Sequence, residues 1–385
     1  MARNVGWFYR NVDVLTAARK RMRWIFEEFE HVCVSWSGGK DSSVTLHLAL
    51  ETARELGRLP LTVVWLDQEA EWQATVDLAV ATLVNNPDVK FDWYQVPIRL
   101  LNSSDLTADG TISESWLDVY NPEKEADWVH PRHPAAIHES PFETDRFAKW
   151  LDAYCGMRPG AYLNGMRIEE SPGRRLGLMN SQVYKQATWG AMTETPGSYR
   201  FCPIYDWSWR DVWRYIYDND VPYNRLYDTQ YQLGIPIRAM RVSSLIHETA
   251  VRNLYYAHEA EPETWNRMVN RIAGIGATHH IAIEDMFDPP KELPFMFGSW
   301  HEYRDYLIEN LVPPSLQQGL RSACASIDKL VKGTPYERDV GIVRGEIKGV
   351  LSGYRTQLDN MEINIRSRLR VMEEEAREAA EYGVR

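Results

Sequence analysis

The segment from Val32 to Leu50, VCVSWSGGKDSSVTLHLAL, constrains the possible folds of this chain more than any other. Residues 31–36 have the apolar run of a short buried strand, and residues 42–56 have the apolar spacing of a helix that Gly57 would end. Two glycines lie between these elements. A strand, a glycine turn and a helix form a phosphate-binding arrangement, because glycines let backbone N–H groups approach an anion and the helix start carries partial positive charge.

The polar residues of this turn suit an anionic ligand. Lys40 can neutralise a phosphate oxygen, and Asp41 and Ser42, in the first helical turn, can cap the helix or reach a metal ion on the phosphates. The turn is not a Walker A loop, which requires glycine at the position of Val34 and Ser or Thr at that of Asp41. It is not a GxGxxG turn either. The alternative is a tight turn with a structural role only.

Strands and helices alternate along the first part of the chain. An amphipathic helix is predicted at 13–30 and another helix at 71–84, with further strands at 61–67, 91–98 and 161–167. Asp13 and Asp206 are plausible caps of the helices that follow them. We therefore predict an α/β fold with a doubly wound, mostly parallel sheet that helices cover on both faces, followed by a helical C-terminal region.

Three parts are predicted from this pattern. Residues 1–30 form an N-terminal helix, residues 31–240 form the domain that carries the glycine turn, and residues 241–385 form a mainly helical C-terminal region. Residues 99–145 lack periodicity but contain Trp128 and several apolar residues, so we predict an ordered insertion over the site.

Composition argues against several classes of protein. A net charge of −11 argues against a protein that coats nucleic acid, which would carry an excess of Lys and Arg. The N-terminus has no apolar signal core, and no apolar stretch approaches the ~20 residues needed to span a bilayer. The four cysteines form no CxxC pair and indicate neither a disulfide scaffold nor a metal site: Cys33, Cys155, Cys202 and Cys324. We predict a soluble, cytoplasmic protein without a membrane partner.

The hexapeptide SGGKDS after a first strand resembles the PP-loop of the ATP-pyrophosphatase superfamily, whose fold is adenine nucleotide alpha-hydrolase-like. Three further segments resemble its phosphoadenylylsulfate (PAPS) reductase-like branch, in the right order: GMRIEESPGRR (165–175), CPIYDWSWRDVWRYI (202–216) and NRLYDTQYQLGI (224–235). This resemblance covers about 30–240. The Trp-rich continuation to about 275 resembles an uncharacterised subgroup of that branch.

The resemblance implies an adenine nucleotide, with ATP and Mg²⁺ as cofactors and Asp41 as the metal ligand. The nucleotide's phosphates would lie in the loop that consists of Ser37, Gly38, Gly39, Lys40, Asp41 and Ser42. Asp67, followed by Glu69 and Glu71, comes after the second strand, where adenosine contact or metal support is expected. The alternative for these acidic residues is a solvated capping turn.

Arg167 and Arg174 follow the fourth predicted strand. They are expected to bind phosphate or substrate, because arginine suits bidentate phosphate recognition. The alternative is a pair of surface salt bridges with Glu169 and Glu170. The catalytic residues implied by the resemblance are therefore Lys40, Asp41, Arg167 and Arg174.

The sequence departs from the PAPS reductases in its cysteines. It lacks their C-terminal Glu-Cys-Gly-x-His type of motif, since Cys324 lies in SACAS, and it lacks the paired cysteines of the cluster-binding relatives. Cys155 and Cys202 are predicted to be buried small hydrophobic residues. These departures make thiol-based reduction doubtful as the activity.

We predict an enzyme that binds ATP, cleaves its α–β bond and adenylates an unknown acceptor. One alternative is a sulfonucleotide (PAPS or APS) reductase with an atypical cysteine. The other is a regulatory module that binds an adenine nucleotide without turnover. A nucleic-acid acceptor, a DNA-associated protein partner and a homo-oligomer are further hypotheses, on which the sequence has little bearing.

Overall fold

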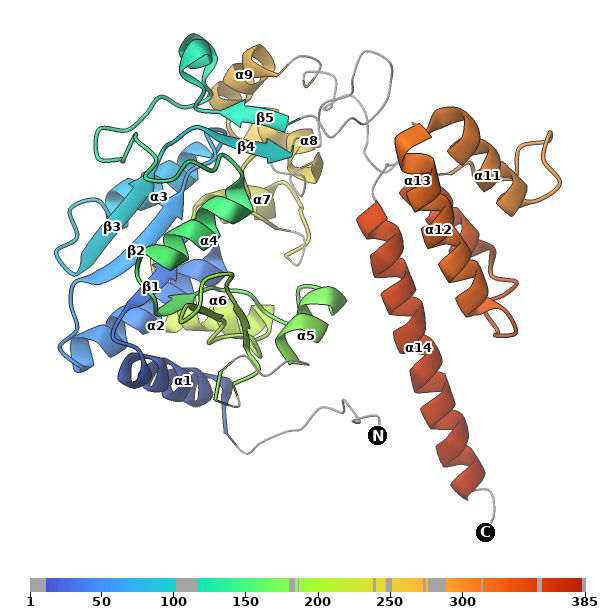
Figure 1. Ribbon diagram of the computed structural model, residues 1–385, viewed down its shortest axis with the longest axis horizontal. Helices are drawn as coiled ribbons and strands as arrows, with labels where there is room; N and C mark the ends of the chain where they lie inside the picture. The colour runs from blue at the N-terminus through green and yellow to red at the C-terminus, as the bar shows by residue number, and fades with distance from the viewer. Residues whose placement is uncertain are drawn as a thin grey trace. The chain divides into compact units, whose positions relative to one another are not determined.

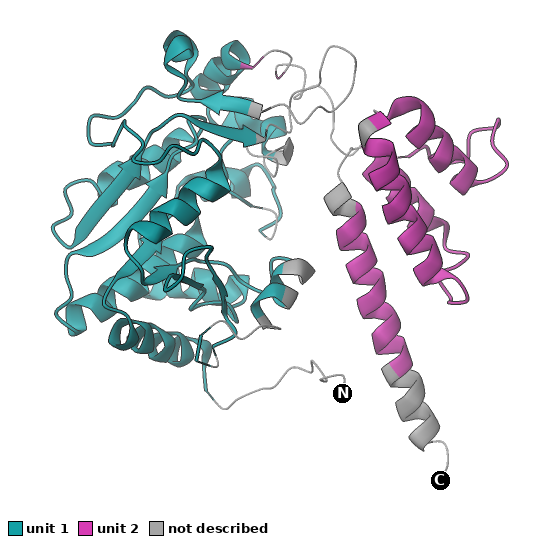
Figure 2. Cartoon of the chain, in the orientation of Figure 1, with its two compact units in different colours: residues 1–101, 116–271 teal, residues 102–115, 272–385 magenta. Residues whose placement is uncertain are grey.

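The computed structural model (Figure 1) divides into two compact units (Figure 2). Unit 1 comprises Met1–Leu101 and Trp116–Arg271, and unit 2 comprises Asn102–Ser115 and Ile272–Arg385. The structure describes residues 12–101, 116–179, 184–185, 187–237, 240–246, 251–272, 275, 289–312, 314–351 and 355–382. None of the helices in these ranges combines the length and apolarity needed to cross a membrane.

Unit 1 is built on a six-stranded sheet of the order β3-β2-β1-β6-β8-β7. Every neighbouring pair is parallel except β7 and β8, which confirms the predicted mostly parallel sheet. The strands are β1 (Val32–Ser35), β2 (Leu61–Leu66), β3 (Val89–Tyr94), β6 (Ala161–Leu163), β7 (Gly190–Met192) and β8 (Tyr199–Phe201). The chain moves outward from β1 through β2 and β3, and then returns to the other side of β1 with β6.

Helices cover both faces of this sheet. On one face, Val34 of β1 and Leu163 of β6 belong to the same core as apolar residues of α1 (Val14–Glu28), α2 (Lys40–Glu55), α3 (Gln73–Thr82) and α6 (Trp209–Asp218). On the other face, Tyr162 packs edge-on against Tyr154 of α4 (Phe147–Met157). Adjacent residues of β6 thus point to opposite layers, as the period of a strand requires, and the doubly wound fold is confirmed.

Several element ends differ from the sequence prediction for local reasons. The helix after the glycine turn begins at Lys40, and β3 ends at Tyr94. Pro97 lies just beyond, and proline cannot donate to a strand ladder. After it the chain forms β4 (Ile98–Leu101), which pairs antiparallel with β5 (Trp116–Val119) in a separate two-stranded sheet.

Two predicted caps have different outcomes. The cap at Asp13 is confirmed, because its carboxylate accepts a hydrogen bond of 2.8 Å from Thr16 N–H. The cap at Asp206 is wrong. Ser208 begins α6 in a capping box with Asp211, whereas Asp206 forms an ion pair with Arg21 of α1.

Helices α5 (Pro172–Met179), α7 (Leu226–Gln232), α8 (Val251–Ala260) and α9 (Pro262–Arg271) complete unit 1. The division between the units follows Arg271, whereas the sequence predicts a boundary at 240. Two long-range contacts account for this. Glu261 accepts hydrogen bonds from the backbone N–H groups of Gln73 (2.7 Å) and Ala74 (3.0 Å) at the start of α3, and Arg271 pairs with Glu69.

Unit 2 is helical in its described residues, as predicted. It contains α11 (Trp300–Leu311), α12 (Pro314–Val331), α13 (Val340–Leu351) and α14 (Arg355–Tyr382) around a core of its own. Arg304 of α11 joins three of these helices, because its Nη1 lies 3.0 Å from Asp328 of α12 and 2.6 Å from Glu346 of α13.

Candidate functional site

A cavity of about 740 Å³ opens in unit 1 at the carboxyl ends of β1, β2 and β6. The chain leaves β1 in one direction toward β2 and returns on its other side at β6, so the cavity lies where the strand order reverses. Ligands of open α/β sheets bind at this point, because the loops on either side diverge and leave a crevice. The volume is within the range of cavities that hold small molecules and cofactors.

The predicted phosphate loop forms part of the cavity wall. Gly38 has φ +71°, a region that favours glycine, and a Cβ added there would collide with Thr75 of α3. Ser42 Oγ donates to Gly39 O (2.9 Å) and accepts from Ser37 N–H (3.3 Å), which holds the turn closed. Gly39 is the N-cap of α2 and has no side chain to cap the helix, and the helix start lines the cavity with Gly39, Lys40 and Asp41.

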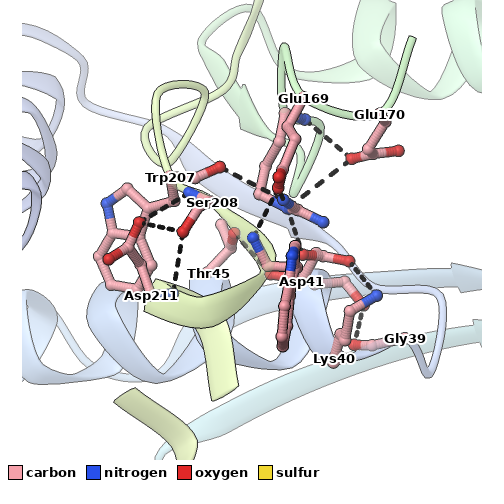
Figure 3. Close-up of polar contacts among 12 residues, drawn as sticks. Gly39, Lys40, Asp41, Thr45, Glu169, Glu170, Trp207, Ser208 and Asp211 are labelled. Atoms are coloured by element: carbon pink, nitrogen blue, oxygen red, sulfur yellow. Dashed lines mark hydrogen bonds and ion pairs between the residues drawn. The ribbon is translucent and has the colours of Figure 1, made fainter. Parts of the chain in front are cut away.

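Lys40 and Asp41 lie side by side in the first turn of α2 (Figure 3). Lys40 Nζ is 3.1 Å from Asp41 Oδ2 and 5.3 Å from the ring centre of Tyr227, and the Lys40 side chain is only 9% exposed. The Tyr227 hydroxyl accepts a hydrogen bond of 3.2 Å from Lys40 N–H. The ammonium group is therefore held at the loop in a fixed position, with little water around it.

Arg167 connects this loop to the segment after β6. Its Nε donates to Asp41 Oδ1 (2.6 Å), and its Nη1 donates to Glu169 (3.0 Å) and to the Trp207 carbonyl (3.2 Å). The ion pair with Glu169 that the alternative predicted for Arg167 is present, but it lies in the interior rather than at the surface, because the Arg167 side chain is 5% exposed. Arg167 therefore holds the Asp41 carboxylate in place, although the two residues are 126 positions apart in the sequence.

Arg174 of α5 also lines the cavity, and its side chain is 40% exposed. It forms the predicted ion pair with Glu170. Burial, and then the nearby positive charge of Arg241, lower the pKa of Arg174. Two arginines therefore gather at this side of the cavity, and an anion bound between them would relieve their repulsion.

The acidic residues after β2 face in different directions. The Asp67 carboxylate is 1% exposed, accepts from Trp93 Nε1 (3.1 Å), Gln95 Nε2 (2.8 Å) and Tyr120 OH (3.0 Å), and does not line the cavity. Glu71 does line it. Asp67 is therefore buried outside the cavity, apart from the predicted residues that line it. Glu71 is the acidic residue of this turn that lines the cavity.

All the other predicted site residues line the cavity except Gly38, and several unpredicted residues line it too. None of the described residues in the predicted insertion 99–145 lines the cavity. Arg200 of β8, Tyr227 of α7 and the α4 residues were not predicted as site residues, although Tyr227 belongs to the quoted segment NRLYDTQYQLGI. Further lining residues come from position 237 and from 240–244: Ile237, Met240, Arg241, Val242, Ser243 and Ser244.

All four cysteines are buried, as predicted for Cys155 and Cys202. Burial raises the pKa of the Cys155 thiol to about 11 and that of Cys202 to about 12. Cys155 lines the cavity. A thiol with such a raised pKa is protonated at neutral pH and is a poor nucleophile.

Asp41 is the residue of the loop that could support a metal ion. Within the described ranges, no three His, Cys, Asp or Glu side chains come together as a metal site. Asp41 already contacts Lys40 and Arg167, so it could supply one oxygen ligand at most. This donor set fits Mg²⁺ bound mainly through substrate phosphates, which is its usual mode at nucleotide sites.

Gly165, in the segment between β6 and Arg167, closely contacts the start of α2. A Cβ added to it would lie 2.6 Å from the Asp41 carbonyl carbon and 2.7 Å from Ser42 N. We expect Gly165→Ala to displace the loop and to lower the free energy of unfolding by about 1–3 kcal/mol. Urea denaturation checks this, with Gly177→Ala as the control, because nothing lies within 4 Å of a Cβ there. If both variants had the same free energy of unfolding, Gly165 would not lie as close to the start of α2 as the structure places it.

Comparison with known proteins gave two family matches. A family model described as "Phosphoadenosine phosphosulfate reductase domain" matches residues 31–234, and one described as "Domain of unknown function (DUF3440)" matches residues 234–331. "Uncharacterized protein YbdN" of Escherichia coli K12 is 29% identical over 333 residues, which are 82% of this chain and 79% of that protein. An adenosine 5'-phosphosulfate reductase of Oceanobacillus iheyensis is 26% identical over 222 residues, 57% of this chain and 75% of that protein.

Solved structures with a similar chain trace were also found. PAPS reductase from Candida auris, in a phosphate complex, has a TM-score of 0.32 and 17% identity, and the match covers 55% of this chain and 84% of that one. FMN adenylyltransferase from Candida glabrata, in complex with ATP, has a TM-score of 0.33 and 13% identity, covering 57% of this chain and 62% of that one.

Proposed function

The chain belongs to the phosphoadenosine phosphosulfate reductase domain family, and from that premise we propose that it is an enzyme that cleaves ATP between the α- and β-phosphates and adenylates an acceptor. The observation that carries the proposal is the loop at the switch point of the sheet. There an uncapped helix start, Lys40 and the Asp41–Arg167 pair converge on one cavity.

The phosphates would lie against the glycine turn. Backbone N–H groups at the start of α2 and the Lys40 ammonium would bind their oxygens, and Arg174 and Arg241 would add positive charge at the rim. Mg²⁺, with Asp41 as its protein ligand, would supply further charge neutralisation of the phosphates. Arg167 positions Asp41 and is too enclosed by Asp41, Glu169 and Trp207 to bind phosphate without giving up one of these contacts.

In the proposed reaction, a nucleophilic atom of the acceptor forms a bond to the α-phosphorus while the bond from that phosphorus to the bridging oxygen breaks. Pyrophosphate leaves with the electron pair, and the acceptor loses its proton to solvent or to a base. Lys40 stabilises the negative charge that develops on the leaving phosphates, and its fixed position means that little reorganisation is needed.

A sulfonucleotide reductase is the second candidate, because Cys155 lines the same cavity. A reductase of this kind needs a thiolate to attack sulfur. Cys155 is 4% exposed and burial raises its pKa, which disfavours the thiolate. A binding module without turnover is the third candidate.

Product analysis separates these three functions. The purified protein would be incubated with α-³²P-labelled ATP and Mg²⁺, with and without cell extract, and AMP, ADP and adenylated species would be separated. AMP or adenylated product that depends on Lys40 supports the proposal. Sulfite from PAPS with thioredoxin, together with unchanged ATP, would replace it with the reductase. If neither product forms and ATP binds, the binding module is the function.

A further inference from the structure

Arg21 of α1 contacts three residues of the segment 203–207 at once. Its Nη1 donates to the Pro203 carbonyl and, at 2.9 Å, to Asp206 Oδ1, and its Nη2 pairs with Asp206 Oδ2. The guanidinium carbon lies 4.7 Å from the ring centre of Tyr205. The exposed fractions of the Arg21 and Asp206 side chains are 14% and 26%, so this bidentate pair is partly buried and has a defined geometry.

A second contact joins α1 to the same segment. Trp207 Nε1 donates to the Val14 carbonyl, at the start of α1, at 3.1 Å. The helix therefore holds the segment both through Val14 and, two turns later, through Arg21. Because α1 precedes residues 31–234, which the reductase-domain model matches, this support comes from outside the matched domain.

The segment that α1 holds also contains two acceptors for the residues that follow β6. The Trp207 carbonyl accepts a hydrogen bond from Arg167 Nη1 at 3.2 Å, and the Tyr205 carbonyl accepts one from Ile168 N–H at 2.9 Å. Arg167 Nε in turn donates to Asp41 Oδ1 at 2.6 Å. A continuous series of contacts therefore runs from α1 through the segment 203–207 to the carboxylate of the glycine turn.

The second acceptor of Arg167 Nη1 depends on the same part of the chain. Glu169 Oε2 accepts from Arg167 Nη1 at 3.0 Å and also from the backbone N–H of Trp209, the first residue of α6, at 2.6 Å. A shift of the segment before α6 would therefore change both contacts of Arg167 Nη1, with Glu169 and with the Trp207 carbonyl. Hydrogen bonds weaken steeply as their angles and distances change, so the guanidinium would lose its fixed orientation.

We infer that Arg21 is a positioning residue of the candidate site: by fixing the segment 203–207 it fixes the Arg167 guanidinium, and through it the Asp41 carboxylate. This rests on the proposed function, in which Asp41 supports the Mg²⁺ on the phosphates of ATP. Arg21 itself does not line the cavity, so its effect on a ligand passes through these contacts. Side chains that orient a ligand-binding group from behind commonly affect binding in this way.

The test measures binding rather than turnover, with the full chain, Mg²⁺ and the α,β-methylene analogue of ATP in isothermal titration calorimetry. Arg21→Ala is expected to raise the Kd of the analogue about 10-fold, the lower end of the loss when an orienting partner is removed. Asp206→Asn should have an effect of about the same size, because it removes the charge from the same pair. Arg21→Lys should raise the Kd only about 3-fold, since one ammonium group keeps the charge but not the bidentate contact.

A double-mutant cycle separates positioning from a general loosening of the domain. In an Asp41→Asn background, Arg21→Ala is expected to change the Kd by less than about 2-fold, because the carboxylate that Arg21 positions is no longer there. A general loosening would weaken binding equally in both backgrounds. Arg167→Lys serves as the background if Asp41→Asn binds the analogue too weakly to be measured.

Arg23→Ala is the matched control on the same helix. Arg23 forms exposed ion pairs with Glu27 and Glu55, each at 3.5 Å, and its removal should leave the Kd at the wild-type value. Circular dichroism checks that each variant is folded at the temperature of the titration. If Arg21→Ala is not folded there, Asp206→Asn takes its place in the cycle.

The outcomes distinguish this inference from the proposed function. Suppose that the ATP analogue binds to the wild type and that Lys40→Ala abolishes binding. If folded Arg21→Ala then binds as tightly as the wild type, or loses as much affinity in the Asp41→Asn background as alone, the inference is overturned and the proposed function stands. If the analogue does not bind to the wild type, both are overturned.

Discussion

Replacing Lys40 by alanine is expected to lower the rate of AMP formation about 100- to 1,000-fold, the loss typical of removing one preorganised charge-stabilising donor. The reason is the position of the ammonium group, which is nearly enclosed, lies 3.1 Å from Asp41 and faces the cavity from the first turn of α2. In such surroundings a charge acts on the phosphates more strongly than in water. The measurement is AMP formed from α-labelled ATP in the extract fraction that supports turnover.

The fold should survive this change, because Asp41 keeps its 2.6 Å hydrogen bond from Arg167 when Lys40 is removed. Far-ultraviolet circular dichroism and the unfolding midpoint check that. Lys20→Ala, an exposed lysine of α1, is the matched control and should have the wild-type rate. Turnover of Lys40→Ala at the wild-type rate would rule out the loop as the reactive centre.

Arg271→Ala is expected to lower the free energy of unfolding of unit 1 by about 3–5 kcal/mol, the usual result of breaking a buried ion pair. Arg271 Nε lies 2.7 Å from Glu69 Oε1, and the exposed fractions of the two side chains are 2% and 0%. Arg271 also donates to the Asp118 carbonyl at 2.7 Å. Its removal leaves the Glu69 carboxylate buried with backbone donors only, from Tyr120 (2.7 Å) and Val129 (3.3 Å).

Guanidinium denaturation followed by tryptophan fluorescence measures this change, with the transition of unit 1 fitted separately, because two compact units need not unfold together. The double variant Glu69→Gln with Arg271→Met should lose less stability than Arg271→Ala alone, since it leaves no unpaired buried charge. Arg214→Ala removes an exposed i,i+4 pair with Asp218 and should have no measurable effect. Equal effects of Arg271→Ala and Arg214→Ala would be inconsistent with a buried pair.

The parts of the molecule that depend on local sequence were predictable. Residues 31–56 predict a strand, a turn and a helix because apolar spacing and glycine positions act over a few residues, and the structure has β1, Gly38 in the left-handed region and α2 there. The parallel sheet follows from the alternation of strands and helices. The start of α1 at Asp13 and the end of α2 at Gly57 were predictable for the same reason, because each residue acts on the end of an adjacent helix.

The composition of the site depended on contacts that no local pattern contains. Arg167 meets Asp41 across 126 residues, because the sheet places the carboxyl ends of β1 and β6 side by side. Arg271, at the end of α9, meets Glu69 across 202 residues. The boundary predicted at 240 could not account for α8 and α9, which are joined to unit 1 by Glu261 and Arg271. Residues 240–244 also line the cavity, and the next residue, Leu245, donates its backbone N–H to the Ala70 carbonyl at 2.8 Å, a contact between distant parts of the chain.

Local sequence was enough to predict a glycine turn between a strand and a helix on a parallel sheet, and to name the residues of that turn. Which acidic residue after β2 faces the cavity depends instead on long-range packing. The strand alternation ends at Leu66, and Glu69 then takes φ +66°, which redirects the chain. Asp67, before this turn, is buried and bonded to Trp93, Gln95 and Tyr120, whereas Glu71, after it, lines the cavity. This difference depends on the fold around the turn, because side-chain direction is periodic only within a regular strand.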